Sequence, residues 1–123
     1  MLCILFLPAC KPTADESISK ISRAWQINKY YEDNLDRTAA FKSTNKNYTL
    51  QFFDDLKFLQ FAVVNDTVRT RSGNWAFSTG LDSLYLYGTT DTSRYFIRLL
   101  RQKNLNIRRV QSDTTYDYLM IDY

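Results

Sequence analysis

The sequence contains no histidine, and this absence excludes several kinds of chemistry. Without imidazole there is no Ser-His or Cys-His nucleophile pair and no metal site that needs a histidine ligand. Both cysteines, Cys3 and Cys10, lie in the first ten residues, so the rest of the chain has no thiol catalysis, thiolate metal site or internal disulfide. A folded domain beyond residue 10 must therefore depend on its apolar core.

Glycine and proline are scarce, with three and two residues, which excludes collagen-like and linker-like classes. No apolar run approaches the roughly 20 residues that a membrane-spanning helix needs. The net charge is only +3, which by itself implies no strong polyanion partner. Aromatic residues, in contrast, are abundant at 15% of 123 residues. This composition and length are typical of one folded domain with a single core.

The first ten residues are apolar and end in Leu7-Pro8-Ala9-Cys10. This ending resembles the lipobox of bacterial lipoproteins, in which the cysteine thiol is acylated and becomes the first mature residue. The stretch is short for a signal peptide and has no basic start, which an upstream start codon would supply. We therefore interpret residues 1–9 as a signal peptide, 10–16 as lipidated Cys10 with a polar tether, and 17–123 as the folded domain. The alternative is an apolar tail with a chance cysteine.

One short helix is predicted before a long series of strands. Thr13 and Glu16 have the spacing of a capping box, and Ile18, Ile21 and Trp25 share one helical face. Period-two runs then predict eight strands, at Trp25–Tyr31, Tyr48–Phe53, Lys57–Val64, Val68–Ser78, Ser83–Tyr87, Arg94–Leu100, Leu105–Val110 and Tyr116–Asp122. Turn residues separate most strands, and residues 33–46 are expected to form one long polar connection.

The strand series favours an all-β fold, an eight-stranded antiparallel up-and-down β-barrel in which the first strand pairs with the last. A five-stranded OB-like barrel is the alternative. The order of lipobox, short helix, early Trp25 and eight strands resembles the lipocalin-like lipoproteins of Gram-negative bacteria. The resemblance rests on Trp25 and on the segments YTLQFFDDLKF, GNWAF and RYFIRLLRQKNLNI. It implies an exported barrel with a ligand cavity, anchored in the cell envelope, with the outer membrane expected.

Alternation predicts which side chains point into this barrel. Twelve are expected inside: Trp25, Ile27, Leu50, Phe52, Trp75, Phe77, Leu86, Ile97, Leu99, Leu105, Ile107 and Met120. They nearly fill a small barrel, so a packed interior is favoured over a hollow one. A bulge at Gly73-Asn74 is expected to turn Trp75 and Phe77 inward, and Lys29 and Thr70 are candidates to line the wide end. A small apolar ligand would contact Trp25, Lys29, Trp75 and Phe77, in a cavity of roughly 300 Å³ or more.

Other aromatic and basic residues are expected on the outer face. Tyr30, Phe53, Tyr85, Tyr87 and Phe96 fall on the polar parity of their strands, beside a basic hairpin at residues 94–109. An exposed aromatic patch marks a partner surface, and the candidates for contact with an envelope protein are Tyr85, Tyr87, Phe96, Arg98 and Arg108. Alternatively, these side chains only cover the sheet. Basic and aromatic residues together also bind single-stranded nucleic acid, but an exported protein is not expected to meet it; an anionic lipid headgroup or acidic glycan fits better.

Carboxylates provide the remaining route to catalysis. A glycosidase needs two opposed carboxyls about 5–9.5 Å apart, whereas the adjacent Asp54 and Asp55 are typical turn formers. With no histidine, phosphate-binding loop or metal motif, we predict a protein that is not an enzyme and has no metal or cofactor. Two functions stay open: binding of a small apolar ligand in the barrel, or a protein–protein interaction through the outer face.

Overall fold

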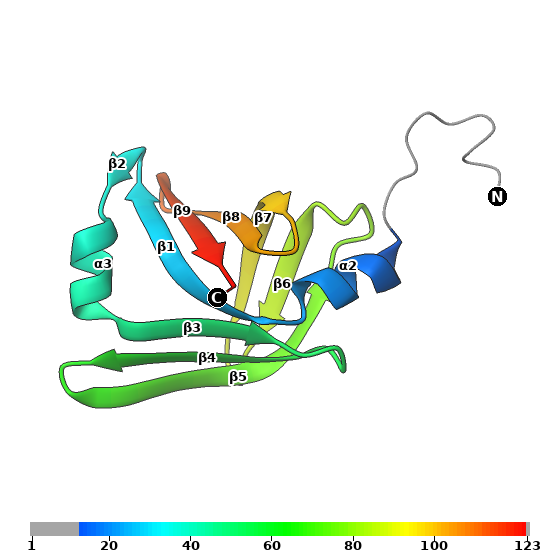
Figure 1. The fold of residues 1–123 in the computed structure, drawn as a ribbon, viewed down its shortest axis with the longest axis horizontal. Helices are drawn as coiled ribbons and strands as arrows, with labels where there is room; N and C mark the ends of the chain where they lie inside the picture. Colours follow the sequence, from blue (N-terminus) through cyan, green and yellow to red (C-terminus); the bar gives the residue numbers. More distant parts are fainter. Residues whose placement is uncertain (1–12, 123) are drawn as a thin grey trace.

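The structure, a computed structural model, describes residues 13–122. Its main feature is one antiparallel sheet that closes into a barrel because β1 also pairs with β9 (Figure 1). The strands are β1 (Ala24–Glu32), β2 (Leu35–Asp36), β3 (Lys46–Phe52), β4 (Lys57–Val64), β5 (Thr67–Phe77), β6 (Ser83–Tyr87), β7 (Thr92–Leu100), β8 (Asn104–Gln111) and β9 (Thr114–Ile121). All eight predicted strands are present, and only the two-residue β2 is additional. The eight-stranded barrel is therefore confirmed, and the five-stranded alternative is wrong.

Strand β1 divides its pairing among three strands, of which the two-residue β2 pairs only with Tyr31 and Glu32. Residues 24–26 of β1 pair with residues 49–51 of β3, whereas residues 26–32 pair with residues 116–121 of β9. Tight turns join the other strands, and Asn65-Asp66 and Ser112-Asp113 both have positive φ at their two residues. Asparagine and aspartate tolerate this conformation, which two-residue hairpin turns need to match the strand twist. The predicted turn positions are therefore confirmed.

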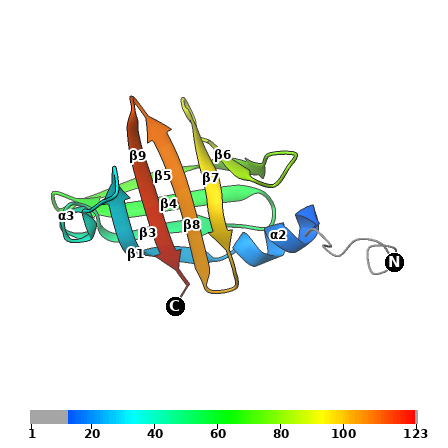
Figure 2. The same cartoon turned by 90° about the horizontal axis from the view of Figure 1, so that it is seen from above.

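Two short helices lie at opposite ends of the barrel, α2 (Ala14–Ile21) and α3 (Thr38–Thr44) (Figures 1 and 2). The predicted capping box of α2 is present, because Thr13 Oγ1 accepts from Glu16 N at 3.1 Å and the Glu16 carboxylate accepts from Thr13 N at 3.1 Å. Ile21 is completely buried, and Trp25 Nε1 donates to its carbonyl at 2.9 Å. Helix α2 therefore closes one end of the barrel, the α2 end. It also begins inside the segment that we assigned to the tether.

Helix α3 was not predicted, because residues 33–46 were expected to be a loop. None of its residues is buried, and its sequence, TAAFKST, carries one large apolar side chain, Phe41. Asp36 Oδ1 accepts from Thr38 N at 2.9 Å and satisfies one free N–H of the first turn. Phe41 attaches the helix to the opposite end of the barrel, the α3 end. Within residues 13–122, no helix is long and apolar enough to cross a bilayer.

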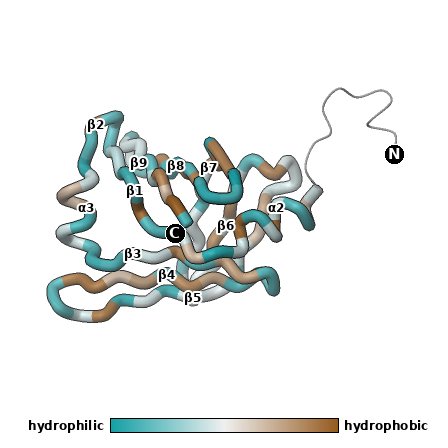
Figure 3. Tube along the Cα trace, viewed as in Figure 1, coloured by the Kyte–Doolittle hydropathy of each residue, from teal (hydrophilic) through white to brown (hydrophobic). Residues whose placement is uncertain are grey.

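The barrel interior is filled by apolar and aromatic side chains. Nine of the twelve residues predicted inside are buried: Trp25, Ile27, Leu50, Phe52, Trp75, Leu86, Leu105, Ile107 and Met120. Phe77 and Ile97 pack against this cluster and are partly exposed. Along the strands, hydrophobic residues recur between hydrophilic ones, as expected for strands with one buried face (Figure 3).

Two bulges reverse the predicted direction of several side chains. The register of β1 on β9 shifts between Ile27 and Lys29, so Tyr30, predicted outside, is buried at 6% exposure. Lys29, predicted inside, points away from the interior, with its Nζ 4.0 Å from the Asp36 carboxylate. A second shift, between Ile97 and Leu99 of β7, pairs Leu100 with the buried Leu105 and leaves Leu99 opposite Asn106. The inward predictions for Lys29 and Leu99 are therefore wrong, as is the outward one for Tyr30.

Strand β5, in contrast, is regular where a bulge was predicted. Gly73 pairs with Phe58 and Asn74 with Lys57, with no shift in register. A Cβ at Gly73 would collide with the carbonyl oxygen of Tyr87, so the glycine allows β6 to approach closely. Because the alternation is unbroken, Arg71 and Arg69 have the same inward parity as Trp75.

Candidate functional site

A cavity of about 240 Å³ lies beside the C-terminal end of α3. Its walls come from that end of the helix and from β3, β4 and β5: Asn45, Tyr48, Gln60, Phe61, Ala62, Val64, Arg69, Thr70 and Arg71. Thr70 therefore lies at the cavity, as predicted for the wide end. The volume is below the roughly 300 Å³ that we expected for a ligand cavity, so it suits a small molecule or part of a larger one.

Helix α3 has empty space on other sides as well. A cavity of about 490 Å³ adjoins Lys42 and Asn45, and one of about 370 Å³ adjoins Arg37 and Phe41. The cavity of about 480 Å³ at the α2 end, between α2 and the β5–β6 connection, has no aromatic side chain in its walls. The α3 end therefore differs from the α2 end in its loosely packed helix and in the tyrosine that lines its cavities.

Aromatic side chains form a cluster inside the α3 end. The Phe41 ring lies 4.5 Å from Tyr30, 5.2 Å from Tyr48 and 6.2 Å from Tyr118, measured between ring centroids. Tyr118 in turn contacts Tyr95 at 5.8 Å. Burial raises the pKa of each of these four tyrosines above its ordinary value. Their hydroxyls are therefore neutral at physiological pH and can donate hydrogen bonds.

Two of these hydroxyls already have protein partners. Gln60 Nε2 donates to the Tyr48 hydroxyl at 2.7 Å, and the Tyr30 hydroxyl donates to Glu32 Oε2 at 2.8 Å. The Tyr48 hydroxyl keeps its own hydrogen for a further acceptor. Since Tyr48 also lines the cavity, it joins the empty space to the aromatic cluster.

Arg109 is the first of two partly buried arginines at inward positions of the barrel. It has the parity of the buried Leu105 and Ile107 on β8, whose register with β9 is unbroken. Its guanidinium carbon lies 5.1 Å from the Tyr116 ring centroid, and it lowers the pKa of Tyr48, Tyr95 and Tyr118 in opposition to burial. Arg109 Nε is shielded from solvent and has no hydrogen-bond partner. A buried donor without an acceptor is costly, so this position is open to an external acceptor.

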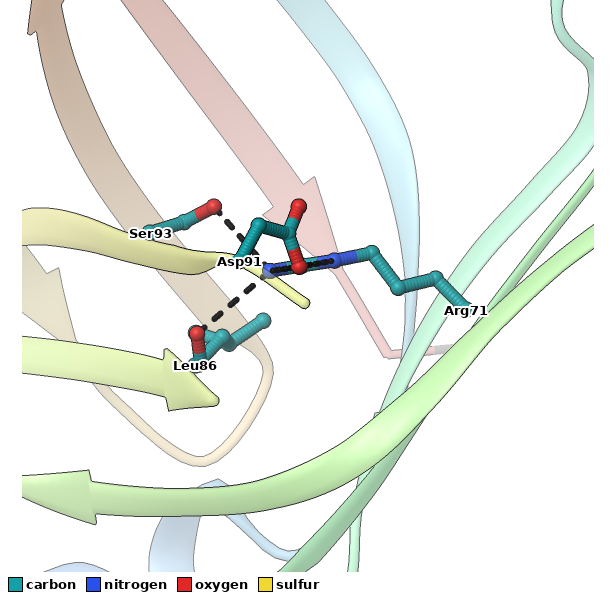
Figure 4. Close-up of polar contacts among 4 residues, drawn as sticks. All are labelled: Arg71, Leu86, Asp91 and Ser93. Atoms are coloured by element: carbon teal, nitrogen blue, oxygen red, sulfur yellow. Dashed lines mark hydrogen bonds and ion pairs between the residues drawn. The ribbon is translucent and has the colours of Figure 1, made fainter. Parts of the chain in front are cut away.

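Arg71, the second inward arginine, is already compensated (Figure 4). It donates to Asp91 Oδ1 from Nε at 3.2 Å and from Nη2 at 3.1 Å, and Nη2 also reaches Ser93 Oγ at 3.2 Å and the Leu86 carbonyl at 3.4 Å. A Cβ at Gly88 would collide with the Asp91 carboxylate, so the missing side chain leaves room for this pair. Arg71 thus joins β5 to β6 and β7 and is primarily structural.

The residues predicted to bind an apolar ligand are not gathered at this cavity. Trp25 and Trp75 are 0% and 1% exposed at the α2 end, and the Trp75 indole donates to the Phe53 carbonyl at 3.0 Å. Phe77 packs edge-on against Trp75 at 5.1 Å. Lys29 lies on the outer face. The structure brings Trp75 and Phe77 together within the core. None of the four predicted ligand contacts borders the cavity beside α3.

The predicted outer residues do lie on neighbouring strands. Tyr85 and Tyr87 stack at 6.1 Å, and the Arg94 guanidinium lies 4.6 Å from the Phe96 ring. Arg108, paired with Phe96 in register, donates to both oxygens of Asp117 at 2.7 and 3.2 Å. Arg98 is exposed at the β7 bulge. An aromatic strip is therefore present, but Asp117 already balances the Arg108 charge.

Comparisons with known proteins identify the fold. No protein-family model matches the sequence, and no curated protein is significantly similar to it. A lipocalin-like protein from Bacteroides uniformis matches with a TM-score of 0.63 and 11% identity, over 85% of this chain and 99% of that one. Bovine odorant binding protein, solved in complex with a selenium-containing odorant, matches at 0.54 and 12%, over 94% and 78%. A deswapped triple mutant of the bovine protein matches at 0.51 and 10%, over 85% and 74%.

These similarities show that the chain has a lipocalin-like fold. The resemblance noted in the sequence is therefore confirmed at the level of the barrel. Cys10 and the predicted lipobox lie outside the described residues.

Proposed function

We propose that this chain is a non-catalytic protein that binds a small ligand at the α3 end of its barrel. The observation that carries this proposal is the cavity of about 240 Å³ beside α3, next to neutral tyrosines inside a closed barrel. The lipocalin-like fold supports it, since bovine odorant binding protein with the same fold was solved with an odorant. At 12% identity only the fold is shared, so we argue the site from this cavity alone.

The ligand would enter between α3 and the β4–β5 hairpin. Helix α3 has no buried residue. Its first residue is tied to β1 by the hydrogen bond from Tyr30 N to Thr38 Oγ1 at 2.9 Å, and beyond it Phe41 holds the helix, so a small displacement of its C-terminal end costs little packing energy. The apolar part of a ligand would lie against Phe61 and Ala62, while Gln60 and Tyr48 provide hydrogen bonds. Such a combination of apolar walls with a few polar groups is typical of small-molecule sites.

Filling the cavity tests this proposal. Ala62→Leu adds three carbons to a cavity wall, so it should weaken binding of the neutral fluorescent probe N-phenyl-1-naphthylamine at least tenfold. Ala76→Leu, on β5 opposite Tyr85 and away from the cavity, is the matched control and should bind as the wild type does. Absence of probe binding to the wild type, or equal affinity of both variants, would rule out a ligand site beside α3.

We further propose that the protein is anchored in the cell envelope, with the outer membrane expected, by acyl chains on Cys10. The support is the Leu7-Pro8-Ala9-Cys10 pattern and the placement of α2, which begins at Ala14 at the end of the barrel opposite α3 (Figure 1). Several acyl chains make such an anchor stable. The cavity would then face away from the membrane.

Mass spectrometry of the protein extracted from membranes of its host tests the anchor. The expected mature mass begins at acylated Cys10, and Cys10→Ser should release the protein from the membrane fraction. An unprocessed chain without lipid in the soluble fraction would contradict the anchor and leave the ligand site unaffected.

The outer strip of Tyr85, Tyr87 and Phe96 supports a second function, contact with an envelope protein. Tyr87 and Phe96 both carry large aromatic rings, yet they are 43% and 38% exposed. In crosslinking on the host cell, the wild type should be joined to an envelope protein. The double variant Tyr85→Ser, Tyr87→Ser should lose this crosslinked product while the circular dichroism of the barrel stays the same. An unchanged crosslinking pattern would eliminate this function.

A further inference from the structure

The arginines of this protein differ in how their charge is balanced. Arg23 pairs with Asp122 at 2.9 Å, Arg71 with Asp91 at 3.1 Å and Arg108 with Asp117 at 2.7 Å. Arg109 has no carboxylate within 4.0 Å among residues 13–122. The other arginines without an ion pair in this part of the chain are exposed to water, whereas Arg109 is partly buried with its Nε sealed off. A guanidinium withdrawn from water without a counter-charge is costly.

The surroundings of Arg109 provide donors and no charged acceptor. Tyr48, Tyr95 and Tyr118 lie within range of its charge and all carry neutral hydroxyls. The acidic groups of the same region are engaged elsewhere, Glu32 with the Tyr30 hydroxyl and Asp91 with Arg71. An arginine fork surrounded by phenol hydroxyls matches the acceptor oxygens of an oxyanion.

A second cation lies at the cavity entrance. Arg69 lines the cavity beside α3, is exposed, and likewise has no carboxylate within 4.0 Å among the described residues. Arg69 at the cavity and Arg109 against the Tyr116 ring therefore place two cations without a carboxylate partner at the α3 end, and their positive potential attracts an anion.

We propose that the ligand is a small organic anion whose carboxylate or sulfonate accepts hydrogen bonds from Arg109 and the hydroxyls of Tyr48 and Tyr118. This inference rests on the proposed function and names the chemical class of the ligand. The oxyanion supplies the counter-charge that Arg109 lacks, and the apolar body of the ligand lies against Phe61 and Ala62. It replaces the purely apolar ligand expected from the sequence, because the α3 end is lined by arginine and tyrosine.

Two matched fluorescent probes test the charge requirement. N-phenyl-1-naphthylamine is neutral, and 8-anilino-1-naphthalenesulfonate is the same skeleton with one sulfonate. The wild type should bind the sulfonate at least tenfold more tightly. Arg109→Gln should reduce sulfonate affinity to that of the neutral probe and change neutral-probe affinity less than twofold. Arg98→Gln, which removes the same charge from the exposed β7 bulge, is the control and should bind both probes like the wild type.

A measurement on the unaltered protein keeps the test valid if Arg109→Gln does not fold. In a ¹H–¹⁵N spectrum of arginine side chains, the Arg109 Nε–Hε signal should shift when the sulfonate probe saturates the protein and stay in place with the neutral probe. An unmoved Arg109 signal at saturation would overturn the inference.

The remaining outcomes separate this inference from the proposed function. If neither probe binds, both fall. If both probes bind with equal affinity, the cavity takes ligands but the anion requirement is wrong. If Arg98→Gln weakens sulfonate binding as much as Arg109→Gln, the probe reports general surface charge, and the inference is overturned.

Discussion

The two ends of the barrel are each covered by a short helix, yet they are built differently. Helix α2 has a capping box and buries Ile21, and beneath it Trp25 and Trp75 are almost completely inaccessible. Helix α3 buries no residue and covers tyrosines and an uncompensated arginine. The α2 end therefore provides much of the stability, and the α3 end retains the polarity and looser packing that binding requires. One small core thus divides these two tasks along the barrel axis.

Truncating one large aromatic residue at each end should produce the largest contrast. Trp75→Ala removes a fully buried indole that packs on Phe52 and Phe77, so we expect a loss of about 3–5 kcal/mol in the free energy of unfolding. Phe41→Ala removes a partly exposed ring and should cost less than half as much. Urea denaturation of both variants measures the difference, and equal losses would show that α3 is as firmly packed as α2.

Alkaline pH should destabilise the α3 end selectively. Because burial raises the pKa of Tyr48, Tyr95 and Tyr118 above that of an unfolded tyrosine, only the unfolded chain loses these protons at first. Stability is therefore complete below about pH 10, the ordinary tyrosine value, and decreases as the pH rises further. Melting temperatures measured from pH 8 to 11 should stay constant up to about pH 10 and then fall in the wild type, and fall less in Tyr48→Phe. Tyr87→Phe, on the outer face, should follow the wild-type profile; identical curves for all three would contradict the buried phenols.

The helix caps should give the smallest difference. Thr13→Ala removes the reciprocal capping box of α2 and should cost about 1 kcal/mol. Asp36→Ala removes the side-chain contact to the first turn of α3 and should cost less, because that helix buries no residue against the barrel. Differential thermal unfolding of the two variants checks the order, and a larger loss for Asp36→Ala would reverse it.

The sequence predicted the barrel well because alternation, turn residues and strand number are local signals. It predicted side-chain direction less well wherever a bulge was involved, since one extra residue moves all following side chains to the other face. Bulges near Asn28 and Arg98 have no distinctive local sequence, and they misplaced Lys29, Tyr30 and Leu99. Gly73 resembled a bulge but serves a close backbone approach instead.

The candidate site was missed for a different reason. Continuing the alternation of Trp75 back along a regular β5 leads to Arg71 and Arg69, and continuing that of Ile107 leads to Arg109. Arg109 was, however, interpreted as part of the basic outer hairpin at residues 94–109, and Arg69 and Arg71 were given no role, because charged residues are rarely buried without a partner. Helix α3 was missed because TAAFKST is too short and too polar to show an amphipathic pattern.

The divided pairing of β1 has a consequence for the synthesis of the protein. Before β9 exists, only residues 24–26 of β1 have their neighbours on β3, and the stretch from Ile27 to Glu32 is an open edge able to pair with another chain. That edge disappears only when residues 116–121 of β9 pair with it. Barrel closure is thus delayed until β9 has been synthesised, and until then the unpaired edge favours aggregation of the nascent chain.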